Sequence, residues 1–198
     1  MGRLDQFMEG LDLQHEISLT DIPEIDLYMD QVIQLFENHF KDTKRNEDEK
    51  ILTKTMINNY AKAKLFFPIK NKKYSKEHLL LISLIYQLKG SLSISDIKET
   101  FQGINKMIVE EESFELEPFY HSYLQLSKEN TVHFKKDIQE RAAEVDKEVA
   151  KLETEKSDYL RKVMLITSLA HISNLYRRAA EQLVDEIMEE QNGKKEIK

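Results

Sequence analysis

The chain of 198 residues contains no cysteine and no tryptophan, and it has only five glycines and three prolines. The absence of cysteine excludes a disulfide framework, a zinc site with thiolate ligands and a thiol nucleophile. It also indicates a reducing compartment, so we expect a cytoplasmic protein. Many-stranded β folds need a turn roughly every 8–12 residues, which so little glycine and proline cannot supply. We therefore predict an all-α protein built from long helices.

Several signals of function are also missing. No apolar run approaches the roughly 20 residues of a membrane span, and the first residues do not read as a signal peptide. The six histidines show no metal-ligand spacing, and neither a phosphate-binding glycine loop nor a catalytic triad is present. We expect no enzyme, no metal, no cofactor and no membrane partner.

The few helix breakers divide the chain. Between Pro118 and Gly193 there is neither glycine nor proline, which predicts long helices, and five glutamates just before that stretch are typical of a solvated connector. The expected parts are an N-terminal arm or short helix (1–20), a first domain (21–109), an acidic connector (110–117) and a long-helix region (118–192).

Four helices are expected in the first domain. Their starts are marked by acidic residues and Pro23, by Thr53, by Ser75, and by the pair Ser93 and Asp96, which has the spacing of a capping box. The expected ranges are 21–40, 54–65, from 76 to an end at Gly90, and 94–101. The third helix is apolar on nearly every side, so it should be surrounded by the others.

A heptad-like apolar seam runs through the long-helix region and lapses near Ser157, where a fresh helix can begin. Its members are Ile138, Ala142, Val145, Val149, Leu152, Tyr159, Val163 and Ile166. Two arrangements fit this pattern: a hairpin that packs on its own chain, or a coiled coil that associates with a second copy. The thin first half of the seam favours association into a homodimer.

The strongest local feature is electrostatic. Eight lysines and no acidic residue lie between Lys50 and Lys76, in a chain whose net charge is −7. We call these eight residues the lysine island: Lys50, Lys54, Lys62, Lys64, Lys70, Lys72, Lys73 and Lys76. Such segregation gives an acidic protein one phosphate-binding face. The alternative is a solvated patch neutralised by acidic neighbours in the fold.

The spacing within the island favours nucleic acid. Lys54, Asn58 and Lys62 recur every four residues on one predicted helix, and Asn59 lies beside them. Lysine neutralises phosphates, whereas asparagine can bond adenine edges. The candidate residues for binding double-stranded DNA are Lys54, Asn58, Asn59, Lys62, Lys64, Lys70, Lys72 and Lys73.

The stretch from Lys54 to Lys98 resembles the MerR-type winged helix-turn-helix. Tyr60, Leu65 and Pro68 match the end of that family's recognition helix, Tyr74-Ser75 matches the end of its wing, and residues 93–98 match the start of its next helix. The segments LYMDQV, TKTMINNYAKAKL and KKYSKEHL are more similar still to a bacterial family, domain of unknown function 1836, that is grouped with MerR-like regulators.

The resemblance implies a helical winged helix-turn-helix with a small wing, followed by long helices that dimerise. It also implies a transcriptional regulator that binds double-stranded DNA in a sequence-specific manner. The chain departs from the pattern at Asn58-Asn59-Tyr60, where MerR-type proteins have Arg-Tyr-Tyr, and at Lys64, where they have glycine. The alternative is a helical protein-interaction module that keeps the winged fold and binds an acidic protein instead of DNA.

Overall fold

The computed structural model describes residues 7–11, 13, 16–110 and 114–196, which are mostly helical. The prediction of a mainly α-helical protein is confirmed. The chain divides into two compact units: the larger comprises residues 14–125 and 181–198, and the smaller comprises residues 1–13 and 126–180.

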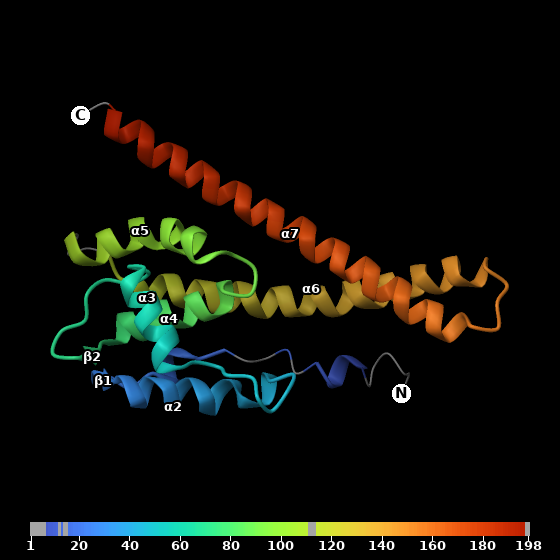
Figure 1. Ribbon diagram of the computed structural model, residues 1–198, viewed down its shortest axis with the longest axis horizontal. Coiled ribbons are helices and arrows are strands. Elements are labelled where there is room, and N and C mark those ends of the chain that lie inside the picture. The colour runs from blue at the N-terminus through green and yellow to red at the C-terminus, as the bar shows by residue number, and fades with distance from the viewer. Residues whose placement is uncertain (1–6, 12, 14–15, 111–113, 197–198) are drawn as a thin grey trace. The chain divides into compact units, whose positions relative to one another are not determined.

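The elements follow one another along the chain as Figure 1 shows. They are η1 (Leu19–Asp21), β1 (Leu27–Tyr28), α2 (Met29–Phe40), η2 (Lys41–Thr43), α3 (Lys54–Lys62), β2 (Lys73–Tyr74), α4 (Lys76–Leu88), α5 (Ile94–Glu110), α6 (Leu116–Ala150) and α7 (Ser157–Glu196). The strands β1 and β2 form a two-stranded antiparallel sheet in which Leu27 pairs with Tyr74 and Tyr28 pairs with Lys73.

The helix α4 is the centre of the larger unit. Every residue from His78 to Ile85 is buried. The same core takes apolar side chains from α2, α3, α5 and the first turns of α6, among them Phe36, Ile57, Phe101 and Tyr120. Each large side chain buried in this way contributes about 1.5–3 kcal/mol. The prediction that this helix is surrounded by others is confirmed.

The expected helix starts at Thr53, Ser75 and Ser93 are confirmed. The Thr53 hydroxyl accepts a hydrogen bond from the Met56 N–H at 3.1 Å, and Ser93 and Asp96 bond reciprocally through side chain and backbone, both at 3.1 Å. The last of these helices, α5, continues to Glu110 instead of ending at Phe101. It does so because further apolar side chains downstream pack against the core.

The first expected helix is wrong in its first half. No helix spans residues 22–28; α2 begins only at Met29, after the short strand β1. Leu27 and Tyr28 are extended because they pair with β2, and the Tyr28 N–H donates to the Gln31 side chain at 2.8 Å where the helix starts. Pro23 therefore lies in irregular chain and not in a first helical turn.

In the smaller unit, α7 folds back after a turn at residues 151–156, so that α6 and α7 form a hairpin there (Figure 1). Ile138, Ala142, Val145 and Val149 are buried, as the first half of the seam predicts. A salt bridge between Arg161 and Asp146 joins the two helices near the turn. The second half of the seam is exposed: Leu152, Tyr159, Val163 and Ile166 are each at least 40% exposed.

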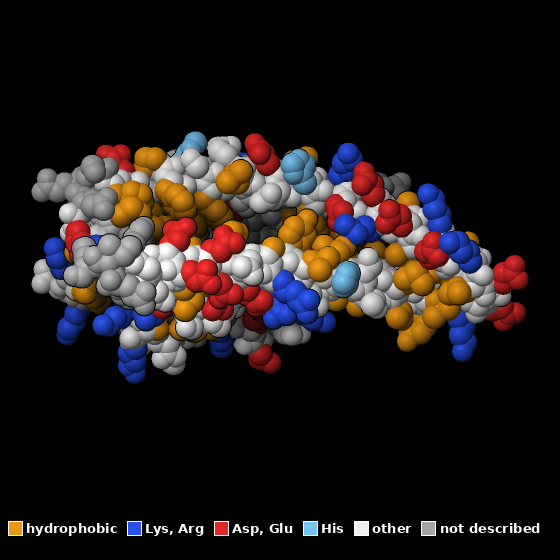
Figure 2. All heavy atoms as spheres, turned by 90° about the horizontal axis from the view of Figure 1, so that it is seen from above, with side chains coloured by type: hydrophobic (Ala, Val, Ile, Leu, Met, Phe, Trp, Pro, Cys, Tyr) orange, Lys and Arg blue, Asp and Glu red, His pale blue; other side chains and the backbone are white. Residues whose placement is uncertain are grey.

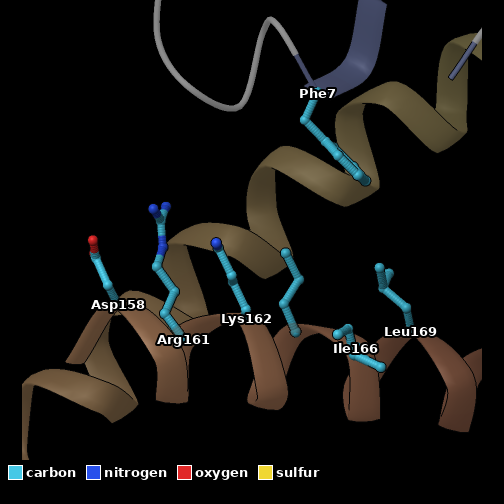
Figure 3. A pocket seen from close by; sticks show the side chains of 7 residues that line it. Phe7, Asp158, Arg161, Lys162, Ile166 and Leu169 are labelled. Carbon is cyan, nitrogen blue, oxygen red and sulfur yellow. The ribbon is translucent and has the colours of Figure 1, made fainter. Parts of the chain in front are cut away.

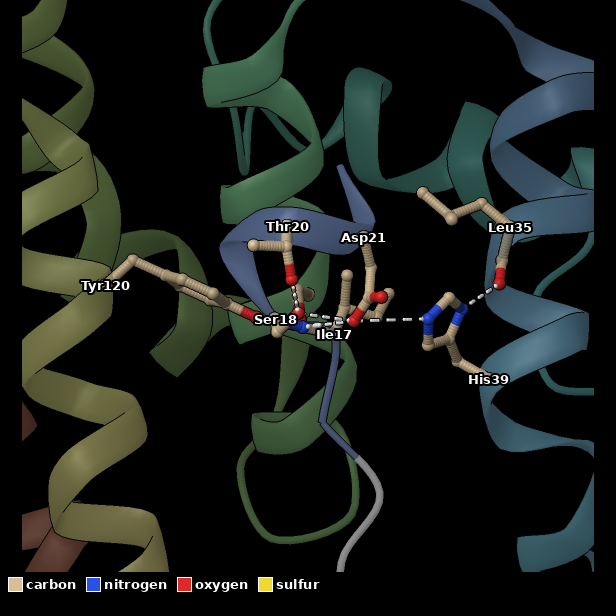
Figure 4. Close-up of polar contacts among 8 residues, drawn as sticks. Ile17, Ser18, Thr20, Asp21, Leu35, His39 and Tyr120 are labelled. Carbon is tan, nitrogen blue, oxygen red and sulfur yellow. Dashed lines mark hydrogen bonds and ion pairs between the residues drawn. The ribbon is translucent and has the colours of Figure 1, made fainter. Parts of the chain in front are cut away.

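A buried polar network ties the chain before α2 to the core (Figure 4). The Tyr120 hydroxyl donates to the Ile17 carbonyl at 2.7 Å and lies 2.8 Å from the Ser83 hydroxyl on α4. Burial raises the pKa of Tyr120 to about 12, so this group stays a neutral donor. Three segments far apart in the sequence thus meet at one hydroxyl.

Nearby, Asp21 and His39 connect η1 to α2 (Figure 4). The His39 Nδ1–H donates to the Leu35 carbonyl at 2.9 Å, and Nε2 lies 3.4 Å from the Asp21 carboxylate. Burial acts to raise the pKa of Asp21, but hydrogen bonds from Ser18 and the charge of His39 outweigh it and lower that pKa. The carboxylate form of Asp21 is therefore favoured in the fold.

Replacing Tyr120 by Phe should lower the free energy of unfolding by about 1–3 kcal/mol, because the Ile17 carbonyl and the Ser83 hydroxyl lose their buried partner. Urea unfolding followed by circular dichroism measures this. The matched control is Tyr159→Phe, at a tyrosine that is 66% exposed, where we expect a change within about 0.5 kcal/mol. Equal effects of the two substitutions would contradict the role given to the network.

Candidate nucleic-acid interface

The helix α3 presents the predicted polar stripe to solvent. Lys54, Asn58 and Lys62 recur every four residues and are exposed, as is Asn59 beside them. On the opposite face, Ile57 and Tyr60 are buried in the core of the larger unit. The helix is therefore fixed by its apolar face and leaves its polar stripe accessible from solvent.

The end of α3 places Lys64 in a left-handed conformation, with φ of 58°. The Leu65 N–H donates to the Tyr60 carbonyl at 3.0 Å and the Lys64 N–H donates to the Ala61 carbonyl at 3.1 Å, which together form a Schellman motif. This position favours glycine, the residue that the MerR pattern has there. Lys64 keeps the turn at a conformational cost and adds an exposed charge.

The loop that follows ends in a tight hairpin turn at Lys70–Lys73. The two central residues, Asn71 and Lys72, have φ of 51° and 59°, and the Lys73 N–H donates to the Lys70 carbonyl at 2.9 Å. Positive φ at both positions is the signature of a type I′ turn. Lys70 and Lys72 are exposed at the tip, whereas Lys73 is half-buried with Nζ 5.2 Å from the centre of the Tyr28 ring.

The base of this loop is held by the buried side chain of His78. Its Nδ1 accepts the Ser75 N–H at 3.1 Å at the start of α4, and its Nε2–H donates to the Phe67 carbonyl at 3.1 Å. The rings of Phe66, Phe67 and Tyr74 surround it, with the Phe67 centroid 3.9 Å away. Burial lowers the pKa of His78, although the bond to Phe67 opposes this, so the imidazole is held neutral.

Two lysines of the island are engaged by carboxylates. Lys76 bridges Glu24 at 2.7 Å and Glu117 at 2.9 Å, and only 16% of its side chain is exposed. Those hydrogen bonds, first that of Glu24, raise the pKa of Lys76. Lys54 pairs with Asp30 at 2.7 Å but stays 63% exposed. Lys76 is therefore a structural cation, whereas Lys54 remains accessible.

Sequence reasoning missed a second polar stripe, on α5. Lys98, Gln102 and Lys106 recur every four residues there, and they share a groove with Lys64 at the end of α3. Both cations also have a carboxylate on their own helix, since Lys98 lies 3.5 Å from Glu99 and Lys106 lies 3.6 Å from Glu110. In the sequence, only the four-residue spacing of Lys98, Gln102 and Lys106 could have indicated this stripe.

Other kinds of site find little support in the described part of the chain. No group of three or more His, Cys, Asp or Glu side chains there is arranged to hold a metal ion. Within residues 7–11, 13, 16–110 and 114–196, no helix has the length and apolar composition needed to cross a bilayer.

Comparison with known proteins gives one match. A family model described as Domain of unknown function (DUF1836) matches residues 17–123. This range nearly coincides with residues 14–125 of the larger unit and contains the whole lysine island. No curated protein and no solved structure matches the chain.

Substituting His78 by Gln should make the free energy of unfolding less dependent on pH. A histidine whose pKa is lowered by folding stabilises the folded state fully when the pH is above its ordinary pKa of 6.5. As the pH falls toward the folded pKa, this stabilisation is lost, because the imidazole of the unfolded chain takes up a proton. Gln at this position keeps the acceptor for the Ser75 N–H and does not titrate. We expect the stability advantage of wild type over His78→Gln to shrink between pH 8 and pH 5 in urea titrations; a constant difference would contradict this.

Substituting Lys64 by Gly should stabilise the protein by about 0.5–1 kcal/mol. Relief of the left-handed strain, about 1–2 kcal/mol, outweighs the added freedom of the unfolded chain. Lys64→Ala removes the same charge and keeps the strain, so it serves as the matched control and should show no gain. Thermal unfolding of the three proteins measures the difference, and a gain in the Ala variant would instead implicate the charge.

Proposed function

The chain belongs to the DUF1836 family, and from its surface chemistry we propose that it is a DNA-binding transcriptional regulator of MerR-like type. In this proposal α3 is the recognition helix of a winged helix-turn-helix, and residues 66–74 form its small wing. The protein acts in the cytoplasm and has no catalytic activity.

The observation that carries the proposal is the charge segregation on α3 and the following loop. Four lysines that carry no carboxylate partner in the described residues are exposed there, namely Lys62, Lys64, Lys70 and Lys72, and Lys50 just before α3 is a fifth. They lie in an otherwise acidic chain. Such a surface binds phosphates, and Asn58 and Asn59 between the cations supply groups that can read base edges.

The order of the elements supports the same assignment. A helix, α2, precedes the candidate recognition helix α3, and a loop with a tight turn at Lys70–Lys73 follows before α4. The strand β2 at the end of this loop pairs with β1, which lies before α2. One feature differs from the usual motif: residues 41–53 connect α2 to α3, whereas a helix-turn-helix commonly uses three or four residues. Ile51 and Leu52, near the end of this connection, are buried in the core of the larger unit.

The homodimer in this proposal forms through the long helices. Tyr159, Val163 and Ile166 on α7 are exposed at heptad spacing, and Figure 2 shows hydrophobic side chains gathered on the part of the surface that the hairpin forms. Exposed apolar stripes of this kind mark association surfaces. A two-fold dimer would present α3 twice, and half-sites about 34 Å apart match one turn of DNA.

A second candidate function has one observation in its favour. Lys54 pairs with Asp30, so a lysine of the island already binds a carboxylate, which supports a module that binds an acidic protein. Binding to duplex DNA at low salt separates the two functions.

The Lys54→Glu/Lys62→Glu variant should lose duplex binding by at least tenfold in gel shifts at low salt, because it reverses two phosphate-binding charges. Wild type should bind with an affinity that falls with a log–log salt slope of roughly −0.9 for each phosphate neutralised. The matched control is Lys135→Glu/Lys136→Glu, which reverses two exposed charges on α6 and should leave affinity within twofold.

Genomic fragments and random duplex are compared in the same assay to measure sequence specificity. Undiminished binding by the Lys54→Glu/Lys62→Glu variant would contradict the assignment of α3. Absence of binding by wild type at low salt would favour the protein-interaction module.

A further inference from the structure

A groove of about 670 Å³ opens between the end of α3, the loop after it and α5. Ala61 and Lys64 line it from the end of α3, Phe67 and Ile69 from the loop, and Lys98 and Lys106 from α5. All these residues lie in the larger unit. The groove therefore adjoins the candidate DNA-binding surface and shares Lys64 with it.

The floor of the groove is apolar and accessible. Phe67 and Ile69 are only half-buried, Pro68 is exposed, and Val109 is 63% exposed. Apolar surface that stays in water next to polar groups is typical of a ligand-binding groove. An occupant with an apolar body would remove this surface from water.

The rim of the groove is positive. Lys64 has no carboxylate partner within the described residues, while Lys98 and Lys106 are each about 3.5 Å from one. Two carboxylates, Glu110 in the lining and Glu99 beside Lys98, offset two of the three lysine charges. The one positive charge that remains suits a single negative charge better than the double charge of a phosphate monoester.

Asn105 connects the groove to the end of α3. Its Nδ2 donates to the Leu65 carbonyl at 3.0 Å, directly after the Schellman turn, and its Oδ1 is buried without a hydrogen-bond partner in the part of the chain that the structure describes. A ligand in the groove would thus touch both α5 and the segment that ends the candidate recognition helix.

We propose that this groove binds a small free carboxylic acid with an apolar body, of the size of a medium-chain fatty acid. The carboxylate pairs with Lys64 and Lys98, and the apolar body lies along Phe67, Ile69 and Val109. The binding itself is independent of the proposed function.

A second groove, in the smaller unit, provides the comparison that makes the test specific. It is lined by Phe7 and by Leu165, Ile166 and Leu169 of α7, with Arg161 and Lys162 at its edge (Figure 3). Arg161 is already paired with Asp146, and Asp158 lies on the same edge. Two carboxylates thus offset its two cations, whereas one lysine charge remains unbalanced beside α3, so a carboxylate should prefer the groove beside α3.

Octanoate is the probe, titrated into the full chain by isothermal titration calorimetry. The Lys64→Ala/Lys98→Ala variant should weaken octanoate binding at least tenfold, and Val109→Glu, which places a carboxylate on an exposed part of the floor, should do the same. The control Arg161→Ala/Lys162→Ala should stay within twofold of wild type. Circular dichroism verifies that each variant is folded.

Three results would overturn the proposal: no octanoate binding by wild type, a larger loss in the Arg161→Ala/Lys162→Ala variant, or equally tight binding of octanol, which lacks the charge. A further measurement rests on the proposed function: saturating octanoate should weaken duplex binding, because it occupies Lys64. If neither wild type nor any variant binds DNA, only the proposed DNA-binding function is contradicted. If DNA binding is intact but calorimetry detects no octanoate binding, only the proposed carboxylate site in the groove is contradicted.

Discussion

The candidate interface depends on one buried imidazole. His78 joins the first turn of α4 to the Phe67 carbonyl, and it can do so only as the neutral tautomer with its proton on Nε2. This contact fixes the base of the lysine-rich loop against the most buried helix of the protein. The loop in turn supplies β2, whose pairing with β1 sets the residue at which α2 begins. A single neutral side chain thus connects the core to the cations that its loop displays.

The helix starts could be predicted because their causes are local. Thr53 and Ser93 each accept a hydrogen bond from the backbone N–H three residues later, and the Ser75 N–H donates to His78 three residues later. Such bonds depend only on spacing within the sequence. The strand β1 could not be predicted in this way. Its partner lies beyond two intervening helices, and two residues are too few to show an alternating pattern, so the acidic residues around Pro23 favoured a helix that the structure does not form.

Some features of the candidate site likewise follow from local sequence, and others only from the tertiary fold. The stripe of Lys54, Asn58 and Lys62 follows from helical period and is exposed, as its spacing predicts. Which lysines remain available does not follow from period. Lys76 is not available to a ligand because it pairs with Glu24 and Glu117. These residues precede and follow it in the sequence, and only the tertiary fold brings their carboxylates to it.

Two polar stripes have equal period, one on α3 and one on α5, and the stripe on α5 shares a groove with Lys64, just after the end of α3. What distinguishes them is the apolar surface beside each. α3 exposes no large apolar side chain, so its cations can follow a hydrated phosphate backbone without leaving apolar surface in water. The stripe on α5 borders Val109 and the half-buried Phe67 and Ile69, which a phosphate backbone would not cover. In both proposals, charge therefore determines where an anion binds, and the neighbouring apolar side chains determine which kind of anion it is.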